Sequence, residues 1–469
     1  MLNEEALYRA APPWAQTILL NLHAVRIHRH RFGAPLREAL AALQRRERAS
    51  PEEVRDYQNA RLRRVVQVAY DRSPYYRKRM EALGLTPADI RGVGDLPKLP
   101  LLTKEEIRTR LTGLLTAAAP QPSWLHGHTS GTTGSPLDLW YDRETAILTN
   151  ATDLLQKRWV GMGARDWIGL LLGRVVVNPS QQRPPFWRAN YLHRQVWFSS
   201  FHLSPENLDL YAAEIRRSGL RFLEGYPSTL FILAQHLERT ERTLPMRAVF
   251  SSSETLHAVQ RETIERAFAC QLYDFYGLAE RVLFAIECDH QVGKHVVEEY
   301  GYVEIVDEQG APVPDGQTGY LVGTSLHNTA LPLLRYRTSD LSRVLTERCP
   351  CGRSGRLLDN VTTKAEDIVV TPDGRLISPS ILTHPFKPFH QILKSQIVQD
   401  EVDRLLVKIV PSEEFTAACQ ARLVTGLRER LGEAVDIEVQ LVKEIPREPS
   451  GKFRWVISRV RHPCHFTWA

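Results

Sequence analysis

The pattern of apolar and polar positions changes its period along the chain. Over the first hundred residues the pattern is helical. Ser50-Pro51-Glu52-Glu53 has the composition of a capping box with proline at the first helical position, and apolar residues between 62 and 69 recur at helical spacing. We predict that this helix ends before Ser73-Pro74, because proline disfavours helical geometry in the residue before it. Thr103-Lys104-Glu105-Glu106 predicts a second, short helix in the same way.

From about residue 120 the pattern changes to short apolar runs that alternate with helical stretches. The runs at 167–172, 248–250 and 271–275 each end in a polar or glycine-containing turn, and we predict them to be strands. This alternation indicates a layered α/β sheet. Residues 296–306 and 320–326 are instead predicted to be antiparallel strands joined by turn residues.

The last hundred residues predict a small α/β domain of their own. Apolar runs at 396–398 and 405–410 precede a helical stretch at 413–431 and a further strand at 437–442. The fold class is therefore α/β, with a large N-terminal domain of several subdomains and a small, separate C-terminal domain. We expect residues 1–110 to form the helical part of the large domain and residues 111–363 to form its core. Residues 364–469 would form the C-terminal domain.

Composition is ordinary for a globular protein and narrows the choice of partner only a little. The chain has 469 residues, of which 43% are hydrophobic and 24% charged, and a formal net charge of +6. That mild excess suits anionic ligands, and no basic motif with interleaved aromatic residues indicates nucleic acid. The apolar run at 14–20 falls short of the roughly 20 residues of a membrane span, and the first residues lack the basic start of a secretory signal. A cytoplasmic protein is expected.

Arginine and histidine crowd together at residues 23–31. Such a run could bind an anion or a membrane surface, or it could be a solvated helix face. Charge runs are more often solvated, so the second interpretation is favoured by about three to one.

The strongest local motif is Thr129-Ser130-Gly131-Thr132-Thr133-Gly134-Ser135-Pro136. Two glycines allow a tight backbone, and backbone N–H groups with several hydroxyls can hold polyphosphate oxygens. It is not a Walker A loop, because the Gly-Lys-Ser/Thr ending is absent.

Three further polar stretches follow predicted strands: Ser251–Glu254, Tyr276–Glu280 and Arg335–Asp340. Ligands of α/β sheets bind beyond the carboxyl ends of the strands, so the first two stretches fit one site, and the third follows the antiparallel section. The Tyr276 ring could stack on a base, the Glu280 carboxylate suits magnesium, and Asp340 could accept ribose hydroxyls.

A last motif, the Pro/Gly-rich segment 445–454, contains Lys452. A positioned ammonium there could neutralise charge that develops on an α-phosphate and a carboxylate.

Taken in order, the stretches 130–134, 276–280, 336–340 and 449–452 resemble the motifs of the adenylate-forming superfamily. Within it, the chain is most similar to the branch of phenylacetate–CoA ligases and CapK-like proteins of capsular polysaccharide biosynthesis. The stretches typical of that branch are 224–228, 252–256 and 349–353.

The resemblance implies two-step chemistry. ATP and a carboxylic acid would form an acyl-adenylate with release of pyrophosphate, and coenzyme A would then take the acyl group. The branch also implies roles for the motif residues. The phosphates would be bound by Ser130, Gly131, Thr132, Thr133 and Gly134, and the adenine would lie beside Ser253, Glu254, Tyr276 and Gly277. Asp340 would bind the ribose, and Glu280 would bind magnesium. The acid would lie beside Tyr226, Pro227 and Ser228.

Catalysis is expected to depend on Lys452, Glu280 and Thr132. Lys452 lies in the C-terminal domain, which the resemblance implies is mobile. The hinge has Thr363-Lys364-Ala365-Glu366-Asp367, so that Lys364 replaces the usual arginine beside the nucleotide and Glu366 is the pivot. Leu137 stands where many superfamily members have lysine after the loop.

Three of the six cysteines, with one histidine, fit a structural zinc site. Cys288 and His295 flank a predicted turn, and Cys349 and Cys351 form a Cys-x-Cys loop. Three thiolates and an imidazole would close a tetrahedron, although Cys-x-Cys alone is weakly diagnostic and His290 competes with His295. The branch resemblance favours the site.

Several alternatives stay open. The acyl acceptor could be an amine, a hydroxyl or a carrier protein, and the chain could instead be a non-catalytic ATP-binding relative. A homodimer is also open. Four aromatic residues are candidates for the acid pocket, at about even odds with a place in the core: Phe186, Trp187, Trp197 and Phe201.

Overall fold

Local capping signals start the N-terminal helices where the sequence predicts them. In the computed structural model, the Ser50 hydroxyl accepts a hydrogen bond from the Glu53 backbone N–H, and the Glu53 carboxylate accepts one from the Ser50 N–H at 2.7 Å. Thr103 and Glu106 form the same reciprocal pair. The helices of this part are α2 (Pro13–Arg31), α3 (Ala34–Arg46), α4 (Pro51–Arg72), α5 (Pro74–Ala82) and α6 (Lys104–Leu114), with 3-10 turns at Pro87–Asp89 and Val93–Lys98.

The structure describes most of the chain. The described residues are 8, 11–129, 137–178, 181–361, 368–377, 379–386, 388–389, 391–446 and 454–460. Within them, no helix is long and apolar enough to cross a membrane.

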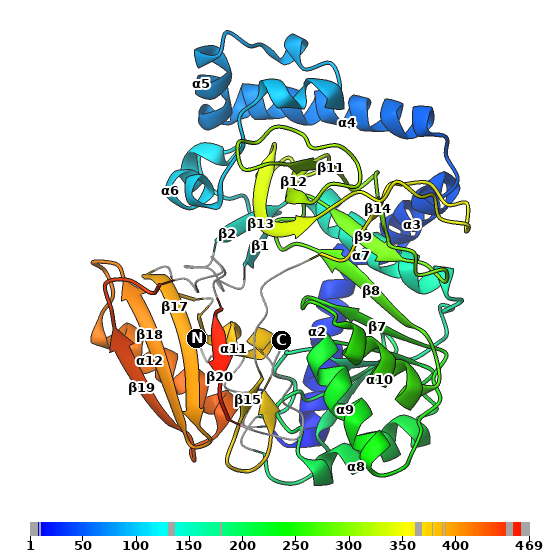
Figure 1. The fold of residues 1–469 in the computed structure, drawn as a ribbon, viewed down its shortest axis with the longest axis vertical. Helices are drawn as coiled ribbons and strands as arrows, with labels where there is room; N and C mark the ends of the chain where they lie inside the picture. The colour runs from blue at the N-terminus through cyan, green and yellow to red at the C-terminus, as the bar shows by residue number, and fades with distance from the viewer. Residues whose placement is uncertain are drawn as a thin grey trace.

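A nine-stranded sheet in the order β14-β10-β9-β8-β7-β6-β3-β5-β4 forms the centre of the large domain (Figure 1). Strands β5, β3, β6, β7 and β8 are parallel, whereas β4 at one end and β9, β10 and β14 at the other are antiparallel to their neighbours. The strands are β3 (Ile168–Leu171), β4 (Trp187–Asn190), β5 (Gln195–Phe198), β6 (Phe222–Gly225), β7 (Ala248–Ser252), β8 (Leu272–Gly277), β9 (Phe284–Glu287), β10 (Lys294–Val296) and β14 (Leu357–Leu358). Helices α7 (Arg143–Trp159), α8 (Pro205–Arg217), α9 (Pro227–Arg239) and α10 (Ala258–Phe268) accompany it.

The prediction of one strand over 296–306 is wrong, because a turn divides it. The Tyr300 N–H bonds back to the Val297 carbonyl at 2.8 Å, so β10 joins the large sheet, while β11 (Gly301–Val306) starts a second sheet. A Cβ on Gly301 would lie 1.9 Å from the Val282 carbonyl oxygen, so only glycine fits this crossing. The second sheet has the order β11-β12-β13, with β12 at Gly319–Ser325 and β13 at Tyr336–Ser342.

A short hairpin, β1 (Leu125–His128) and β2 (Asp138–Tyr141), carries the two ends of the phosphate-loop motif. Leu139 and Tyr141 are buried in the core beneath it. The hairpin closes next to the motif, where the Leu137 N–H donates to the Thr129 hydroxyl at 2.9 Å and the Thr129 N–H donates to the Leu137 carbonyl at 3.1 Å.

The C-terminal domain is a four-stranded sheet, β19-β18-β17-β20, with α12 packed against it (Figure 1). Its elements are β15 (Val369–Val370), β16 (Leu376–Ile377), α11 (Pro379–Leu382), a 3-10 turn (His384–Phe386), β17 (Ile392–Glu401), β18 (Arg404–Pro411), α12 (Ala417–Leu431), β19 (Asp436–Leu441) and β20 (Val456–Ser458). The predicted strand–helix–strand order of this segment is confirmed.

One arginine joins this domain to the large one. The Arg375 guanidinium donates hydrogen bonds to the carbonyl oxygens of Arg430 and Leu431, which end α12, at 3.1 and 2.7 Å. It also donates to the carbonyl of Phe201 in the large domain at 2.8 Å. Phe201 itself is fully buried among the core residues of the C-terminal domain.

Candidate functional site

The carboxyl ends of the parallel strands β6, β7 and β8 lie side by side and bring predicted site residues together. Tyr226 follows β6, Ser253 and Glu254 follow β7, and Tyr276 and Gly277 end β8. Parallel strands direct their carboxyl ends to one edge of a sheet, which is where ligands of α/β folds bind. We call this group the edge site.

Glu254 is fixed against the start of α9. Its carboxylate accepts a hydrogen bond from the backbone N–H of Ser228 at 3.0 Å, where the positive end of the helix dipole favours an anion. Ser253 has φ +71°, in the left-handed region that a serine seldom adopts, and this turns the chain after β7. Burial raises the pKa of the neighbouring Tyr226 to about 12, so its hydroxyl stays protonated.

Two tyrosine–carboxylate pairs complete the edge site. The Tyr276 hydroxyl donates to Asp340 Oδ2 at 2.6 Å, and the Tyr336 hydroxyl donates to Glu280 Oε1 at 2.7 Å. Glu280 is buried, whereas Asp340 is partly exposed. Burial and the adjoining carboxylates raise the pKa of both tyrosines well above the usual range, so each hydroxyl remains a donor. Because the Tyr276 ring is itself buried, the expected stacking on a base stays a prediction.

Lys104 is a charged group of this site that the sequence did not reveal. It begins α6, and its charge interacts with both Glu280 and Asp340. Burial lowers the pKa of Lys104, and the two carboxylates oppose that shift. The capping box around Lys104 predicts only a helix start, since nothing local signals a contact so far along the chain.

Several predicted site residues lie outside the described part of the chain. They are Ser130, Gly131, Thr132, Thr133 and Gly134 of the phosphate loop, Lys364 and Glu366 of the hinge, and Lys452. Their roles stay predictions.

The four predicted zinc ligands lie together at the other edge of the sheet. The three sulfur atoms of Cys288, Cys349 and Cys351 and one ring nitrogen of His295 all lie within 4.8 Å of one another. Cys288 Sγ is 3.4 Å from Cys349 Sγ, and Cys351 Sγ is 3.4 Å from His295 Nε2. The competing His290 is exposed and is not in the group. We call this group the Cys/His cluster.

The protonation states of the cluster suit a metal ligand set. Burial lowers the pKa of His295 to about 4, so the imidazole is neutral. Its Nδ1 faces the Ser354 carbonyl at 3.3 Å, which assigns the proton to Nδ1 and leaves the Nε2 lone pair toward the sulfurs. Burial raises the pKa of Cys288 to about 12, an environment that keeps a thiol neutral unless a cation is present. At Cys351 burial also acts upward, but hydrogen bonds, the Arg353 N–H foremost, outweigh it and lower the pKa.

The aromatic candidates for the acid pocket are mostly core residues. Phe186 and Trp197 belong to the core of the large domain, and Phe201 to that of the small one. Trp187 is only partly buried and packs against the first of these cores.

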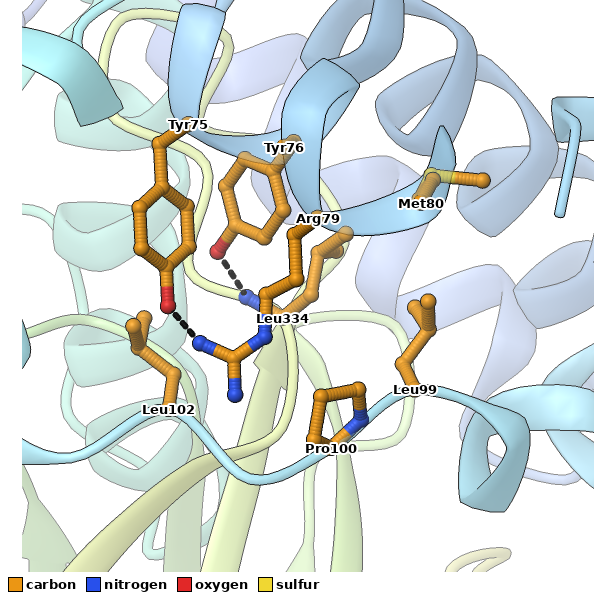
Figure 2. Close-up of a pocket in the computed structure, with 8 residues that line it drawn as sticks. All are labelled: Tyr75, Tyr76, Arg79, Met80, Leu99, Pro100, Leu102 and Leu334. Carbon is orange, nitrogen blue, oxygen red and sulfur yellow. Dashed lines mark hydrogen bonds between the residues drawn. The ribbon is translucent and has the colours of Figure 1, made fainter. Parts of the chain in front are cut away.

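A small cavity beside α5 has a packing role (Figure 2). Its volume is about 10 Å³, room for no more than one water molecule. Tyr75 accepts from Arg79, and Tyr76 accepts from the Leu334 N–H at 3.0 Å (Figure 2). The first contact lies within α5, and the second attaches α5 to the segment before β13.

Known proteins resemble the chain over most of its length. A family model described as the CapK C-terminal domain matches residues 369–459. The phenylacetate-coenzyme A ligase of Pseudomonas putida is 30% identical over 340 residues, which cover 70% of this chain and 75% of that protein. The phenylacetate-coenzyme A ligase of Thermus thermophilus is 24% identical over 448 residues, covering 87% of this chain and 96% of the other.

Among solved structures, a 2-hydroxyisobutyryl-CoA ligase in complex with 2-HIB-AMP and CoA has a similar fold. The TM-score is 0.60 at 20% identity, over 89% of this chain and 92% of that one. The expected architecture, a large N-terminal and a small C-terminal α/β domain, is thereby confirmed.

Proposed function

The chain belongs to the phenylacetate–coenzyme A ligase family, and from this we propose that it joins a carboxylic acid to coenzyme A at the expense of ATP. In the first step a carboxylate oxygen attacks the α-phosphorus of ATP, and pyrophosphate leaves. In the second step the coenzyme A thiolate attacks the acyl carbon, and AMP leaves. Adenylation is needed because a carboxylate is a poor electrophile.

The observation that carries this proposal is the gathering of the edge site. Residues at or next to β7, β8, β13 and α6 meet there, and each carboxylate accepts a hydrogen bond from this chain. The Tyr276 hydroxyl orients Asp340 by a hydrogen bond to Oδ2, and Asp340 is the residue that would accept ribose hydroxyls. Glu254 and Ser253 lie on the next strand end, where the adenine would lie.

Glu280 is the proposed ligand of the magnesium ion that accompanies ATP. The Tyr336 hydroxyl occupies Oε1, so Oε2 can face the ion. Bound there, magnesium would neutralise phosphate charge. Lys104 supplies a positive charge beside the same carboxylate.

The remaining roles follow from the motifs. Ser130–Gly134 would hold the β- and γ-phosphates, and Lys452 would promote adenylation by stabilising the charge on the α-phosphate and the carboxylate. Lys364 would approach the nucleotide from the hinge. The acid would lie beside Tyr226, Pro227 and Ser228. Tyr226 precedes the first residue of α9 and lies against Gly173, two residues after β3.

We also propose that the Cys/His cluster holds a structural zinc ion. Three sulfurs and one neutral imidazole make a closed tetrahedral set, with no position left for a substrate. The ion would tie the loop 349–351 to the ends of β9 and β10.

The identity of the acyl acceptor distinguishes this function from the alternative functions. Transfer to a carrier protein, an amine or a hydroxyl is the alternative, as is binding of ATP without catalysis. The use of ATP and coenzyme A favours a cytoplasmic location.

The test is acid-dependent exchange of pyrophosphate into ATP over a panel of aryl, acyl and sugar-linked acids, followed by mass spectrometry of the thioester. We expect exchange with at least one acid, and a coenzyme A thioester of that acid. Exchange without thioester would favour another acceptor. ATP binding with no exchange for any acid would overturn the proposal.

A further inference from the structure

Three metal-ligating side chains lie together on the β1–β2 hairpin, outside the edge site. His126 and His128 are two residues apart on β1, so both point to the same face of the hairpin. Asp138 of β2 pairs directly with His128 in the antiparallel register, and Trp140 pairs with His126. The opposite face, with Leu139 and Tyr141, is buried in the core. The three polar side chains therefore share the outer face.

The distances bring three ligand atoms to one point. Asp138 Oδ1 lies 2.8 Å from His126 Nε2 and 2.9 Å from His128 Nδ1. One nitrogen of each imidazole and one carboxylate oxygen all lie within 4.8 Å of one another. Ligand atoms around one metal ion, with bonds of about 2.0–2.2 Å, lie roughly 3–4 Å apart. Shifts of a few tenths of an ångström would thus admit an ion.

The rings are already held in place. The His126 ring stacks on Trp140 with the centroids 4.4 Å apart and the planes 20° from parallel. It also packs against the His128 ring at 4.2 Å and 69°. Because neighbours restrict these rotamers, less conformational entropy is lost when an ion binds. The side chains of His126, His128 and Asp138 are 40%, 31% and 24% exposed, so an ion can enter from solvent.

We propose that His126, His128 and Asp138 form a second metal site, for a divalent transition-metal ion such as Zn²⁺ or Co²⁺. Two imidazole nitrogens and one carboxylate oxygen are a donor set for such ions, whereas Mg²⁺ and Ca²⁺ prefer oxygen alone. Three protein ligands leave coordination positions open to water or another small ligand.

The ion would link the two strands of the hairpin. His128 and Asp138 are the last register pair before Thr129 and Leu137, where the hairpin closes. A bond from each strand to one ion would stiffen this stem, and an ion that binds only the folded chain would raise its stability. The proposed ligase activity does not require this site, so either proposal can fail without the other.

Cobalt titration of the full chain, followed by visible absorption and by metal content after dialysis, tests this site. Thiolate ligands give Co²⁺ intense charge-transfer absorption, and nitrogen and oxygen ligands do not. We expect a weakly absorbing Co²⁺ that binds in addition to any ion at the Cys/His cluster. His126→Ala and Asp138→Ala should each weaken its binding at least tenfold.

Two controls make the result decisive. His23→Ala removes an exposed histidine of α2 and should leave Co²⁺ binding within twofold of the parent. Cys351→Ser should abolish the intense absorption and leave the weakly absorbing ion in place. If this variant does not fold, the test is to compare the total cobalt per chain of the two alanine variants with that of the parent. A parent that binds no cobalt beyond the Cys/His cluster, or alanine variants that bind it as tightly as the parent, would overturn the site in favour of a plain ion pair.

Discussion

The Cys/His cluster and the edge site lie at opposite ends of two neighbouring strands. β8 runs toward the edge site and ends at Gly277, whereas the antiparallel β9 runs away from it and ends at Glu287, next to Cys288. At the cluster, three sulfurs and an imidazole face one another. At the edge site, each carboxylate accepts a hydrogen bond from a backbone N–H or a tyrosine hydroxyl of another segment.

We infer that the cluster stabilises the fold and that the edge site binds substrates. A closed set of ligands contributes to the stability of the fold, because an ion bound by all four would tie their segments together. The carboxylates of the edge site lie at the strand ends where α/β sheets bind their ligands, so their loss should alter binding and catalysis before stability. Substitutions at the two ends should therefore give opposite patterns of effect.

The largest effect should come from the cluster. Cys351→Ser removes one of four ligands, and we expect it to cost about 4 kcal/mol or more of unfolding free energy and to release zinc. Denaturant unfolding and metal analysis measure both. Cys270→Ser, a partly buried cysteine away from the cluster, is the matched control and should cost less than about 1.5 kcal/mol. Equal losses of unfolding free energy in the two variants would contradict a stabilising role for the Cys/His cluster.

Glu280→Gln should show the reverse pattern. The amide keeps the shape and can still accept from Tyr336, but it loses the charge that would face magnesium. We expect acid-dependent pyrophosphate exchange to fall at least about a hundredfold, with unfolding free energy changed by less than about 1 kcal/mol. Exchange rates at saturating magnesium and a denaturant curve test the two halves. A variant that loses stability and keeps its exchange rate would place Glu280 with the structural group.

Tyr276→Phe should have a smaller effect at the same edge. It removes the hydroxyl that orients Asp340, a hydrogen bond to a charged group worth about 1.5 kcal/mol or more. We expect the KM for ATP to rise about tenfold while kcat stays within twofold, measured by steady-state kinetics. Tyr320→Phe, on β12, is the control and should leave KM unchanged. A change in kcat alone would assign Tyr276 a different role.

The smallest effect should be a pH dependence that comes from the turn between β10 and β11. Burial raises the pKa of Glu299, between β10 and β11, to about 7. The folded state then keeps a proton that the unfolded state releases above about pH 4.3, so stability should fall as pH rises from about 4.3 to 7. Solvent screening limits the loss to about 1 kcal/mol.

Denaturant midpoints across this range measure the slope for Glu299. Glu299→Gln should flatten it, because glutamine does not titrate. A variant that keeps the full slope would assign the pH dependence to another group.

Much of the fold could be predicted because its signals are local. Ser50 with Glu53, and Thr103 with Glu106, fix two helix starts within four residues. The polar stretches after β7 and β8 could be placed at one edge because parallel strands share a direction. The four cluster ligands could be grouped because the resemblance to the branch supported a Cys-x-Cys spacing that is weakly diagnostic alone.

What could not be predicted depends on contacts between distant segments. Lys104 has the sequence signal of a helix start, and only the packing of α6 beside β13 brings its charge to Glu280. The turn at 297–300 interrupts a continuous apolar pattern, since the crossing at Gly301 is set by Val282 from another segment. His126, His128 and Asp138 flank the phosphate-loop motif, and the hairpin register, not the spacing, brings them together.

The three carbonyl contacts of Arg375 have a consequence for the kinetics of domain motion. Two of them stay within the C-terminal domain, and the bond to Phe201 is the one that a rotation of that domain would break. A hydrogen bond from a charged donor is worth about 1.5–3 kcal/mol, roughly a tenfold to hundredfold preference in population. The resemblance predicts that the C-terminal domain rotates. In that rotation, this preference would lengthen the time spent at the domain angle that keeps the bond to Phe201.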